Sequence, residues 1–164
     1  MPDILNLEDF MNMPEIKELC CNNPKFRKII GSNPHFRKAL NNDIFKKCIL
    51  EIGKLPYKLD PIDKRKKGSH EQMKIIRFEY NTEKGEKSII WLYFPQSSTS
   101  KSIQCRLQKY SYNDEKVKAP KSSDNRGYPE IFIHNENEIM NLISCINMYM
   151  SNVLKISVNT KFYK

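Results

Sequence analysis

Glycine and paired cysteines are scarce in this chain of 164 residues. Its five glycines form neither a GxGxxG nor a GxxxxGK loop, which excludes the common glycine-rich phosphate-binding motifs. Its five cysteines include no CxxC pair, the spacing that places two ligands on one tetrahedral zinc ion. The adjacent Cys20 and Cys21 would need an unusual geometry to bind zinc together with Cys48, so buried thiols are the better interpretation. We therefore expect no metal site and no cofactor.

Long apolar runs are also missing from the sequence. No stretch approaches the roughly 18–20 apolar residues that a membrane-spanning helix needs. The acidic beginning MPDILNLEDF does not look like a secretory signal. Without such a signal, an odd number of cysteines favours free thiols in a reducing compartment over disulfides. These features predict an intracellular protein, cytoplasmic or nuclear, that does not bind membranes.

Side chains that could form a catalytic site are scattered along the chain. The three histidines, His35, His70 and His134, are far apart in the sequence. Glu138 follows His134 by four residues, but we expect a strand-to-helix junction between them. A metal-dependent nuclease site could be assembled from Glu71, Glu79 and Glu86 with neighbouring lysines, yet any hairpin rich in Lys and Glu would permit that. We name no catalytic residue and favour a non-enzymatic protein over an enzyme.

The net charge of +9 is concentrated in the middle of the chain. Residues 54–128 contain seventeen Lys and Arg against nine Asp and Glu, whereas residues 1–53 have a net charge of +1 and residues 129–164 are neutral. The excess begins with a run of four basic residues, Lys64, Arg65, Lys66 and Lys67. Such a concentration attracts nucleic-acid phosphates or an anionic protein surface. The alternative is a solvated face that only keeps the protein soluble.

Residues 14–43 repeat with a period of ten, PEIKELCCNN PKFRKIIGSN PHFRKALNND, and an eroded fourth copy begins at Asp43. Asn before Pro is typical of a helix start, because the Asn side chain caps the first turn and Pro suits its first position. Asn23-Pro24 and Asn33-Pro34 therefore predict a succession of short helices. Their expected ranges are near 14–21, 24–31, 34–41 and 43–53.

The third and seventh positions of each repeat are apolar and lie one turn apart on the same helix face. Short helices of this kind, over residues 13–53, resemble the Asn-Pro helical repeats of the Hop and ubiquilin co-chaperones. In that family the helices form a cup whose apolar groove binds hydrophobic peptide segments. The resemblance implies a groove lined by four apolar residues, Phe26, Ile30, Phe36 and Leu40. The alternative is a helical collar that packs these side chains on the rest of the protein.

From residue 73 the apolar period changes to two, as in β-strands. KIIRFEYN and SIIWLYF, joined by TEKGEK, predict a hairpin, while SIQCRLQKYSY predicts a third strand and EIFIH a fourth. Asn135 and Glu138 form a capping pair that begins a helix over about 135–154. The apolar stripe of this helix is wide enough to cover one face of the sheet. The stretch ISVNTKFY could add an edge strand.

The predicted fold class is α+β: an N-terminal run of short helices, then a four-stranded antiparallel sheet in the order ββββα, covered by one long C-terminal helix. We divide the chain into a short-helix region at 1–53, a basic linker at 54–72 and a sheet-and-helix domain at 73–164. The order of elements over 73–154 resembles the Pur-type and transcriptional-coactivator-type modules. That resemblance implies binding of single-stranded nucleic acid on the open sheet face.

The third predicted strand carries the candidate binding surface. Its apolar residues, Ile103, Cys105 and Leu107, alternate with polar ones and are expected to face the core. The opposite face presents amides, a guanidinium and two phenols, from Gln104, Arg106, Gln108, Tyr110 and Tyr112. Amides and guanidiniums hydrogen-bond to bases and phosphates, and tyrosine rings stack on unpaired bases. An ordinary solvated sheet face is the alternative.

The sequence thus predicts a non-enzymatic nucleic-acid-binding protein. Single-stranded RNA or a ribonucleoprotein is favoured over duplex DNA, because duplex readers usually present a basic helix to the major groove. The expected phosphate contacts are Lys64, Arg65, Lys66, Lys67, Lys118, Lys121 and Arg126. The second hypothesis is an adaptor that binds an apolar partner segment through the N-terminal helices.

Overall fold

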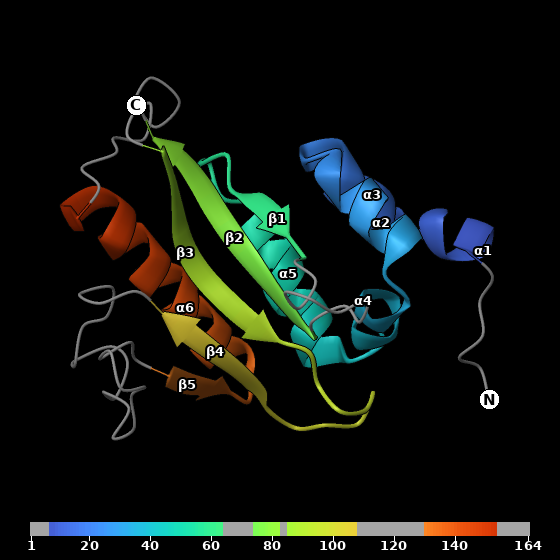
Figure 1. The fold of residues 1–164 in the computed structure, drawn as a ribbon. Helices are drawn as coiled ribbons and strands as arrows, with labels where there is room; N and C mark the ends of the chain where they lie inside the picture. Colours follow the sequence, from blue (N-terminus) through green and yellow to red (C-terminus); the bar gives the residue numbers. More distant parts are fainter. Residues whose placement is uncertain (1–6, 64–73, 83–84, 108–129, 154–164) are drawn as a thin grey trace, which may run out of the picture.

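A run of helices precedes an antiparallel sheet, and one further helix follows it (Figure 1). The computed structural model describes residues 7–63, 74–82, 85–107 and 130–153. The first five helices are α1 (Leu7–Met11), α2 (Pro14–Asn22), α3 (Lys25–Ser32), α4 (Pro34–Ala39) and α5 (Asp43–Gly53). The predicted breaks at Pro24, Pro34 and near Asp43 are therefore confirmed. Helix α1 was not predicted, because it lies outside the ten-residue repeat and spans little more than one turn.

The sheet has five strands rather than the four that the sequence predicted. They are β1 (Asp60–Ile62), β2 (Ile75–Thr82), β3 (Gly85–Tyr93), β4 (Ile103–Leu107) and β5 (Glu130–Ile133), and each pairs antiparallel with the next. Strand β1 lies inside segment 54–72, which was predicted to be a linker. Its three residues, Asp-Pro-Ile, are too few to show an alternation, and Pro61 is tolerated because β1 is an edge strand.

The C-terminal helix begins where the sequence predicted it. Asn135 is the N-cap of α6 (Glu136–Met148), and its side chain accepts a hydrogen bond from the Glu138 N–H at 3.0 Å. The Glu138 carboxylate accepts from the His134 N–H, also at 3.0 Å, so the two side chains satisfy donors reciprocally. A π-helical turn, Tyr149–Val153, continues α6. The possible edge strand in ISVNTKFY lies outside the described residues.

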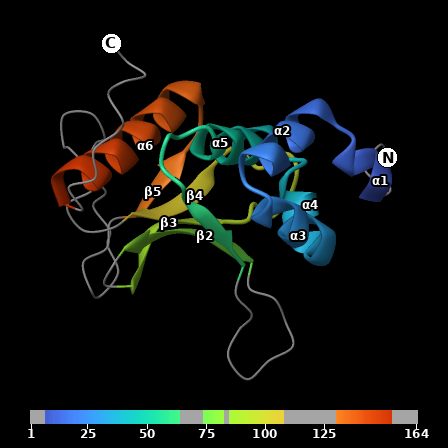
Figure 2. The same cartoon turned by 90° about the horizontal axis from the view of Figure 1, so that it is seen from above.

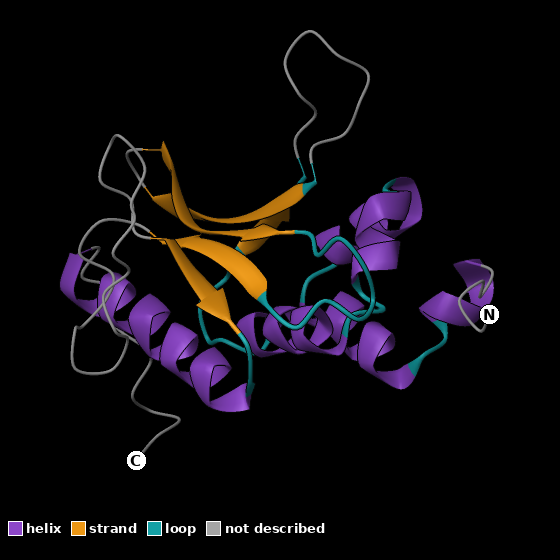
Figure 3. Ribbon diagram, turned by 90° about the horizontal axis from the view of Figure 1, so that it is seen from below, coloured by secondary structure: helices purple, strands orange, loops and turns teal. Residues whose placement is uncertain are grey.

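Helices α5 and α6 lie on one face of the sheet, as the views from above and from below show (Figures 2 and 3). The long C-terminal helix is therefore not the sole cover that the sequence predicted. Lys47 of α5 and Glu136 of α6 form an ion pair of 2.8 Å between the two helices. On the sheet, Ile103, Cys105 and Leu107 of β4 are buried against this layer, as the alternation predicted. None of the described helices lies over the opposite face.

The N-terminal helices share one apolar core with the sheet. The Phe26 ring of α3 lies 5.9 Å from that of Phe78 in β2, and Phe36 packs 5.7 Å from Phe94 beyond β3. All four side chains proposed for a partner groove, Phe26, Ile30, Phe36 and Leu40, are at most 2% exposed. In this structure they form a collar packed on the sheet, since the N-terminal helices need those contacts to be stable.

Three asparagines of the repeat are buried, and each accepts a hydrogen bond near a helix start and also donates to a distant group. Asn23, Asn33 and Asn42 are 7%, 0% and 1% exposed. The Asn33 side chain accepts from the His35 and Phe36 N–H groups at 3.0 and 3.2 Å, which begins α4. Its amide nitrogen donates to Asp63 Oδ2 at 3.0 Å, 30 residues away. One side chain thus starts a helix and attaches it to the segment after β1.

Asn42 and Asn23 follow the same rule. The Asn42 oxygen accepts from the Phe45 N–H at 3.0 Å, and its nitrogen donates to the carbonyls of Ser97 and Ser100 at 3.2 and 2.8 Å. Asn23 accepts from the Lys25 N–H and donates to the Leu59 carbonyl and to Asp60. These amides fix the starts of α3 and α5 relative to β1 and to the connection between β3 and β4.

Burial alone would raise the pKa of the Asp60 carboxyl, but hydrogen bonds from Lys25 and Asn23 outweigh burial and lower it. The Lys25 Nζ lies 2.8 Å from Asp60 Oδ2. Because the folded-state pKa is depressed, this contact stabilises the fold at neutral pH, and the contribution is lost as the pH falls through the folded-state pKa. The attachment of α3 to β1 is therefore sensitive to acid.

The double use of Asn42 predicts that Asn42→Asp destabilises the protein although Asp is a good N-cap. The new carboxylate keeps the acceptor for Phe45 but loses the donor and faces two carbonyls, which should cost about 2–3 kcal/mol in the free energy of unfolding. Chemical denaturation measures it. The neighbouring Asn41 is exposed, so Asn41→Asp should change stability by less than about 0.5 kcal/mol. Equal effects of the two substitutions would contradict the role given to Asn42.

The collar predicts that Phe36→Ala lowers the free energy of unfolding by about 3–5 kcal/mol, because it leaves a cavity among packed rings. Phe132→Ala is the matched control, since that ring is 49% exposed and should lose less than about 0.5 kcal/mol. Thermal or denaturant unfolding measures both. A near-neutral Phe36→Ala would show that Phe36 lines a groove instead of a core.

Candidate functional site

The candidate site is the face of the sheet that no described helix covers. Across it, Arg77 of β2, Trp91 of β3, Arg106 of β4 and Glu130 of β5 are directly paired neighbours in the strand register. The adjacent residues Cys105 of β4 and Ile131 of β5 point to the other face, where they are buried. A single row of polar and aromatic side chains therefore crosses four strands.

Trp91 is the centre of this row. The guanidinium carbon of Arg106 lies 4.9 Å from the centre of the Trp91 ring, and that of Arg77 lies 5.4 Å from it. The indole N–H donates to Ser88 Oγ at 2.7 Å, which fixes the ring. Two cations at these distances are attracted by the electron-rich ring faces. Because Trp91 already holds two guanidiniums, it positions the arginines and is not a free stacking surface.

Each arginine of the row also meets a carboxylate. Arg77 Nη2 lies 2.9 Å from Glu79 Oε2, and Arg106 Nη2 lies 3.4 Å from Glu130 Oε1. The side chains of Arg77 and Arg106 are 20% and 17% exposed, so both are largely packed into the face. The two arginines and the carboxylates of Glu79 and Glu130 balance one another in charge. These groups therefore do not attract an anion by net charge.

A second, more exposed row lies beside the first at the β5 edge. Gln104 of β4 pairs with Phe132 of β5, and the Phe132 ring is 49% exposed. Gln104 Nε2 donates to Glu130 Oε2 at 3.3 Å, which connects the two rows. We call Gln104, Arg106, Glu130 and Phe132 the β4–β5 patch. In this patch an exposed aromatic ring lies next to an amide, a guanidinium and a carboxylate.

The positive charge of the chain lies mostly in segments that flank this face in sequence. Residues 64–73, between β1 and β2, contain four Lys and Arg against one Glu, and residues 108–129, between β4 and β5, contain five against three Asp and Glu. Strand β4 ends at Leu107 and β5 begins at Glu130, so the second segment leaves and rejoins the sheet beside the patch. Both segments lie outside the described residues.

Two of the predicted contact residues, Gln104 and Arg106, are described, and the structure brings them together on the uncovered face. The other ten lie outside the described residues: Lys64, Arg65, Lys66, Lys67, Gln108, Tyr110, Tyr112, Lys118, Lys121 and Arg126. For these ten, contact with a ligand stays a prediction.

Sequence reasoning did not name Phe132, Glu130, Trp91 or Arg77 as site residues. The first two had a signal: in EIFI, the buried Ile131 and Ile133 place Phe132 and Glu130 on the opposite face. Trp91 had none, because SIIWLYF is apolar on both faces and the partner across a strand depends on register. A bulge at Phe78 and Glu79 shifts that register further.

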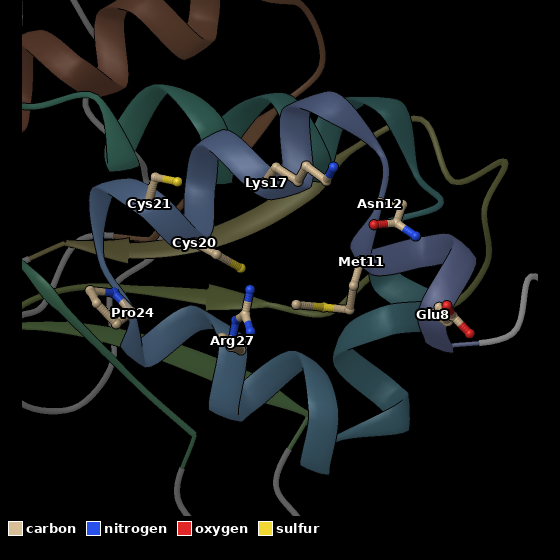
Figure 4. Close-up of a pocket in the computed structure, with 8 residues that line it drawn as sticks. All are labelled: Glu8, Met11, Asn12, Lys17, Cys20, Cys21, Pro24 and Arg27. Atoms are coloured by element: carbon tan, nitrogen blue, oxygen red, sulfur yellow. The ribbon is translucent and has the colours of Figure 1, made fainter.

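A hollow of about 460 Å³ lies apart from the sheet, between α1, α2 and α3 (Figure 4). It is lined by Glu8, Met11, Asn12, Lys17, Cys20, Cys21, Pro24 and Arg27. Burial raises the pKa of the Cys20 thiol, and the nearby charge of Arg27 opposes this only partly. A thiol with a raised pKa is a poor nucleophile. Cys20 is buried whereas Cys21 is exposed, which does not suit a shared metal ion.

The remaining thiols do not form a reactive site either. Burial raises the pKa of the Cys48 thiol to about 12, and burial, followed by the neighbouring Cys48, raises that of Cys105 well above its usual value. Both therefore behave as small apolar side chains of the core. Within the described ranges, no three His, Cys, Asp or Glu side chains are grouped so that they could hold a metal ion.

Comparisons with known proteins found no match among protein-family models, curated proteins or solved structures. Among the helices that the structure describes, none is both long enough and apolar enough to cross a membrane. The function therefore has to be inferred from the geometry of the uncovered face and from the charge of the segments that connect its strands in sequence.

The contact between Arg106 and Trp91 predicts a measurable coupling. In a double-mutant cycle of Arg106→Met and Trp91→Leu, the two effects on the free energy of unfolding should be non-additive by about 0.5–2 kcal/mol. A second cycle pairs Trp91→Leu with Lys101→Met, an exposed lysine, and should be additive within about 0.5 kcal/mol. Additivity in the first cycle would show that the stacked arrangement contributes nothing to stability.

Proposed function

We propose that this protein binds single-stranded nucleic acid, RNA in preference to duplex DNA, on the uncovered face of its sheet. The observation that carries the proposal is the exposed Phe132 ring beside Gln104 and Arg106, on a face free of described helices. An exposed aromatic ring on a strand is a stacking surface for an unpaired base, worth about 1–3 kcal/mol per base. Amide and guanidinium groups beside it can hydrogen-bond to base edges or phosphates.

The division of charge supports the same function. Long basic side chains supply most of the attraction to phosphates, whereas contacts to base edges need donors and acceptors in fixed positions. In this chain the fixed groups lie on the strands, and the excess of Lys and Arg lies in the connecting segments. Within the proposal, Lys64, Arg65, Lys66, Lys67, Lys118, Lys121 and Arg126 contact phosphates. Gln108, Tyr110 and Tyr112 extend the base-contacting surface beyond Leu107.

The adaptor hypothesis has less support, because the four apolar side chains that it needs are buried in the core of the protein itself. A partner segment could reach them only if the collar detached from the sheet. That detachment would expose Phe26 and Phe36 together with the sheet residues that they cover, at a large cost in burial. The uncovered sheet face requires no such rearrangement.

The test is a titration of the protein with a short single-stranded RNA at low salt. Trp91, the single tryptophan of the chain, lies in the face and reports binding through its fluorescence. Phe132→Ala should weaken binding roughly tenfold to a hundredfold, because it removes one stacking surface. Met140→Ala is the matched control: that side chain is equally exposed at 49%, but it lies on α6, and its loss should leave the affinity unchanged.

The salt dependence separates stacking from phosphate contacts. Replacing Lys64, Arg65, Lys66 and Lys67 by Gln should weaken all sequences about equally and reduce the salt slope by about one unit per lost contact. Phe132→Ala and Tyr110→Ala should lower the affinity with little change in slope, because stacking releases no counterions. If wild-type protein binds no oligonucleotide at low salt, the proposal is wrong, and the basic segments serve an anionic protein partner or solubility.

A further inference from the structure

The carboxylate of Glu130 is the least expected group on a surface proposed to bind a polyanion. It lies between two donors of β4: Arg106 Nη2 at 3.4 Å from Oε1 and Gln104 Nε2 at 3.3 Å from Oε2. Both contacts are long for charge-assisted hydrogen bonds. The side chain is 21% exposed, so part of the carboxylate stays accessible. Among the described residues, these two donors orient the carboxylate in the patch that contains Phe132, and both contacts leave lone pairs on its oxygens for a ligand.

We infer, on the basis of the proposed function, that Glu130 reads the edge of a base stacked on Phe132 and that the patch prefers guanine. Residues two apart on a strand lie about 6.5–7 Å from one another on the same face. This spacing is close to the distance between the centre of a stacked purine and an acceptor atom that is hydrogen-bonded to the edge of that purine. Glu130 and Phe132 have this spacing in β5.

The chemistry of the carboxylate selects among the four bases. An ionised carboxylate only accepts hydrogen bonds, and its two oxygens match two parallel donors. Guanine presents two adjacent donors, N1–H and the N2 amino group, on one edge, with the O6 acceptor beside them. Adenine and cytosine present one amino group next to an acceptor nitrogen, and uracil presents one N–H between two carbonyls. The carboxylate therefore favours guanine most and uracil least.

The neighbouring donors complete the match. When the carboxylate accepts from guanine N1–H and N2–H, the O6 acceptor points away from Glu130 and toward a donor. Gln104 and Arg106 are the donors beside Glu130 on this face. Two donors and one acceptor on the base then face two acceptors and a donor on the protein. A bidentate contact of this kind is worth about 1–3 kcal/mol of discrimination, or roughly fivefold to a hundredfold in affinity.

The experiment compares four oligouridine RNAs of equal length that differ only in one central base, G, A, C or U. Dissociation constants are measured at one fixed salt concentration for wild-type protein and Glu130→Gln. Wild type should bind the G-containing RNA at least about fivefold more tightly than all-U RNA. Glu130→Gln replaces one acceptor by a donor and removes a negative charge. It should reduce the preference for G to near onefold while binding all-U RNA equally or more tightly.

Glu18→Gln is the matched control for charge, because Glu18 is exposed on α2 and the substitution leaves the β4–β5 patch intact. It should retain the full preference for G. Glu130→Asp provides a second variant should Glu130→Gln unfold: it keeps the charge but withdraws the carboxylate, so the preference should also fall. Circular dichroism establishes that each variant is folded before its affinities are compared.

The outcomes separate this inference from the proposed function. If wild type binds all four RNAs equally, and Phe132→Ala still weakens binding, the guanine preference is wrong and the binding face stands. If a preference for G survives in both Glu130 variants, Glu130 is not the residue that reads the base. If no RNA binds, the proposed function itself is wrong.

Discussion

The buried amides of Asn23, Asn33 and Asn42 are the constraint on which the arrangement of the N-terminal half depends. Helices of two turns have little stability alone, and an apolar face does not define where along a sheet they sit. An amide offers an acceptor to a helix start and a donor to a distant group at once. Each amide therefore fixes a helix start and its place relative to the strands, which an Asp carboxylate could not do because it only accepts hydrogen bonds. The asparagine at or near the end of each ten-residue repeat makes this contact.

The same asparagine contacts also determine which face of the sheet the described helices leave uncovered. The Asn contacts hold α3, α4 and α5 against the sheet, and the buried strand residues, among them Phe78, Leu92 and Cys105, belong to the core that these helices share with it. The opposite face is left to side chains that must satisfy one another in partial contact with water. Arg77 and Arg106 meet this requirement because they stack on Trp91 and pair with carboxylates. A face held rigid by such contacts can present a few further groups, here Phe132 and Gln104, in fixed positions.

A structural feature of this protein can be predicted from the sequence when only neighbouring residues determine it. The breaks between helices at Pro24 and Pro34 obey rules that involve two or three neighbouring residues, and the sequence predicts them. Alternation in β4 correctly predicts that Cys105 is buried and that Gln104 and Arg106 are on the other face. Strand β1 escapes prediction because three residues are a strand only through their pairing with β2. The position of Trp91 escapes for the same reason, since cross-strand neighbours are set by register.

The balanced charge of the uncovered face is consistent with a binding role when phosphate attraction and base recognition are supplied by different parts of a chain. Attraction to phosphates is long-ranged and tolerates variable geometry, so it needs cations but not a rigid scaffold. Base recognition needs donors and acceptors in fixed positions, and an acceptor on a protein surface is usually a carboxylate, amide or carbonyl oxygen. A carboxylate surrounded by close ion pairs has fewer lone pairs left for a ligand. In the β4–β5 patch the arginine is shared between Trp91 and Glu130, and Gln104 is the other described donor, so the carboxylate is oriented by two long contacts.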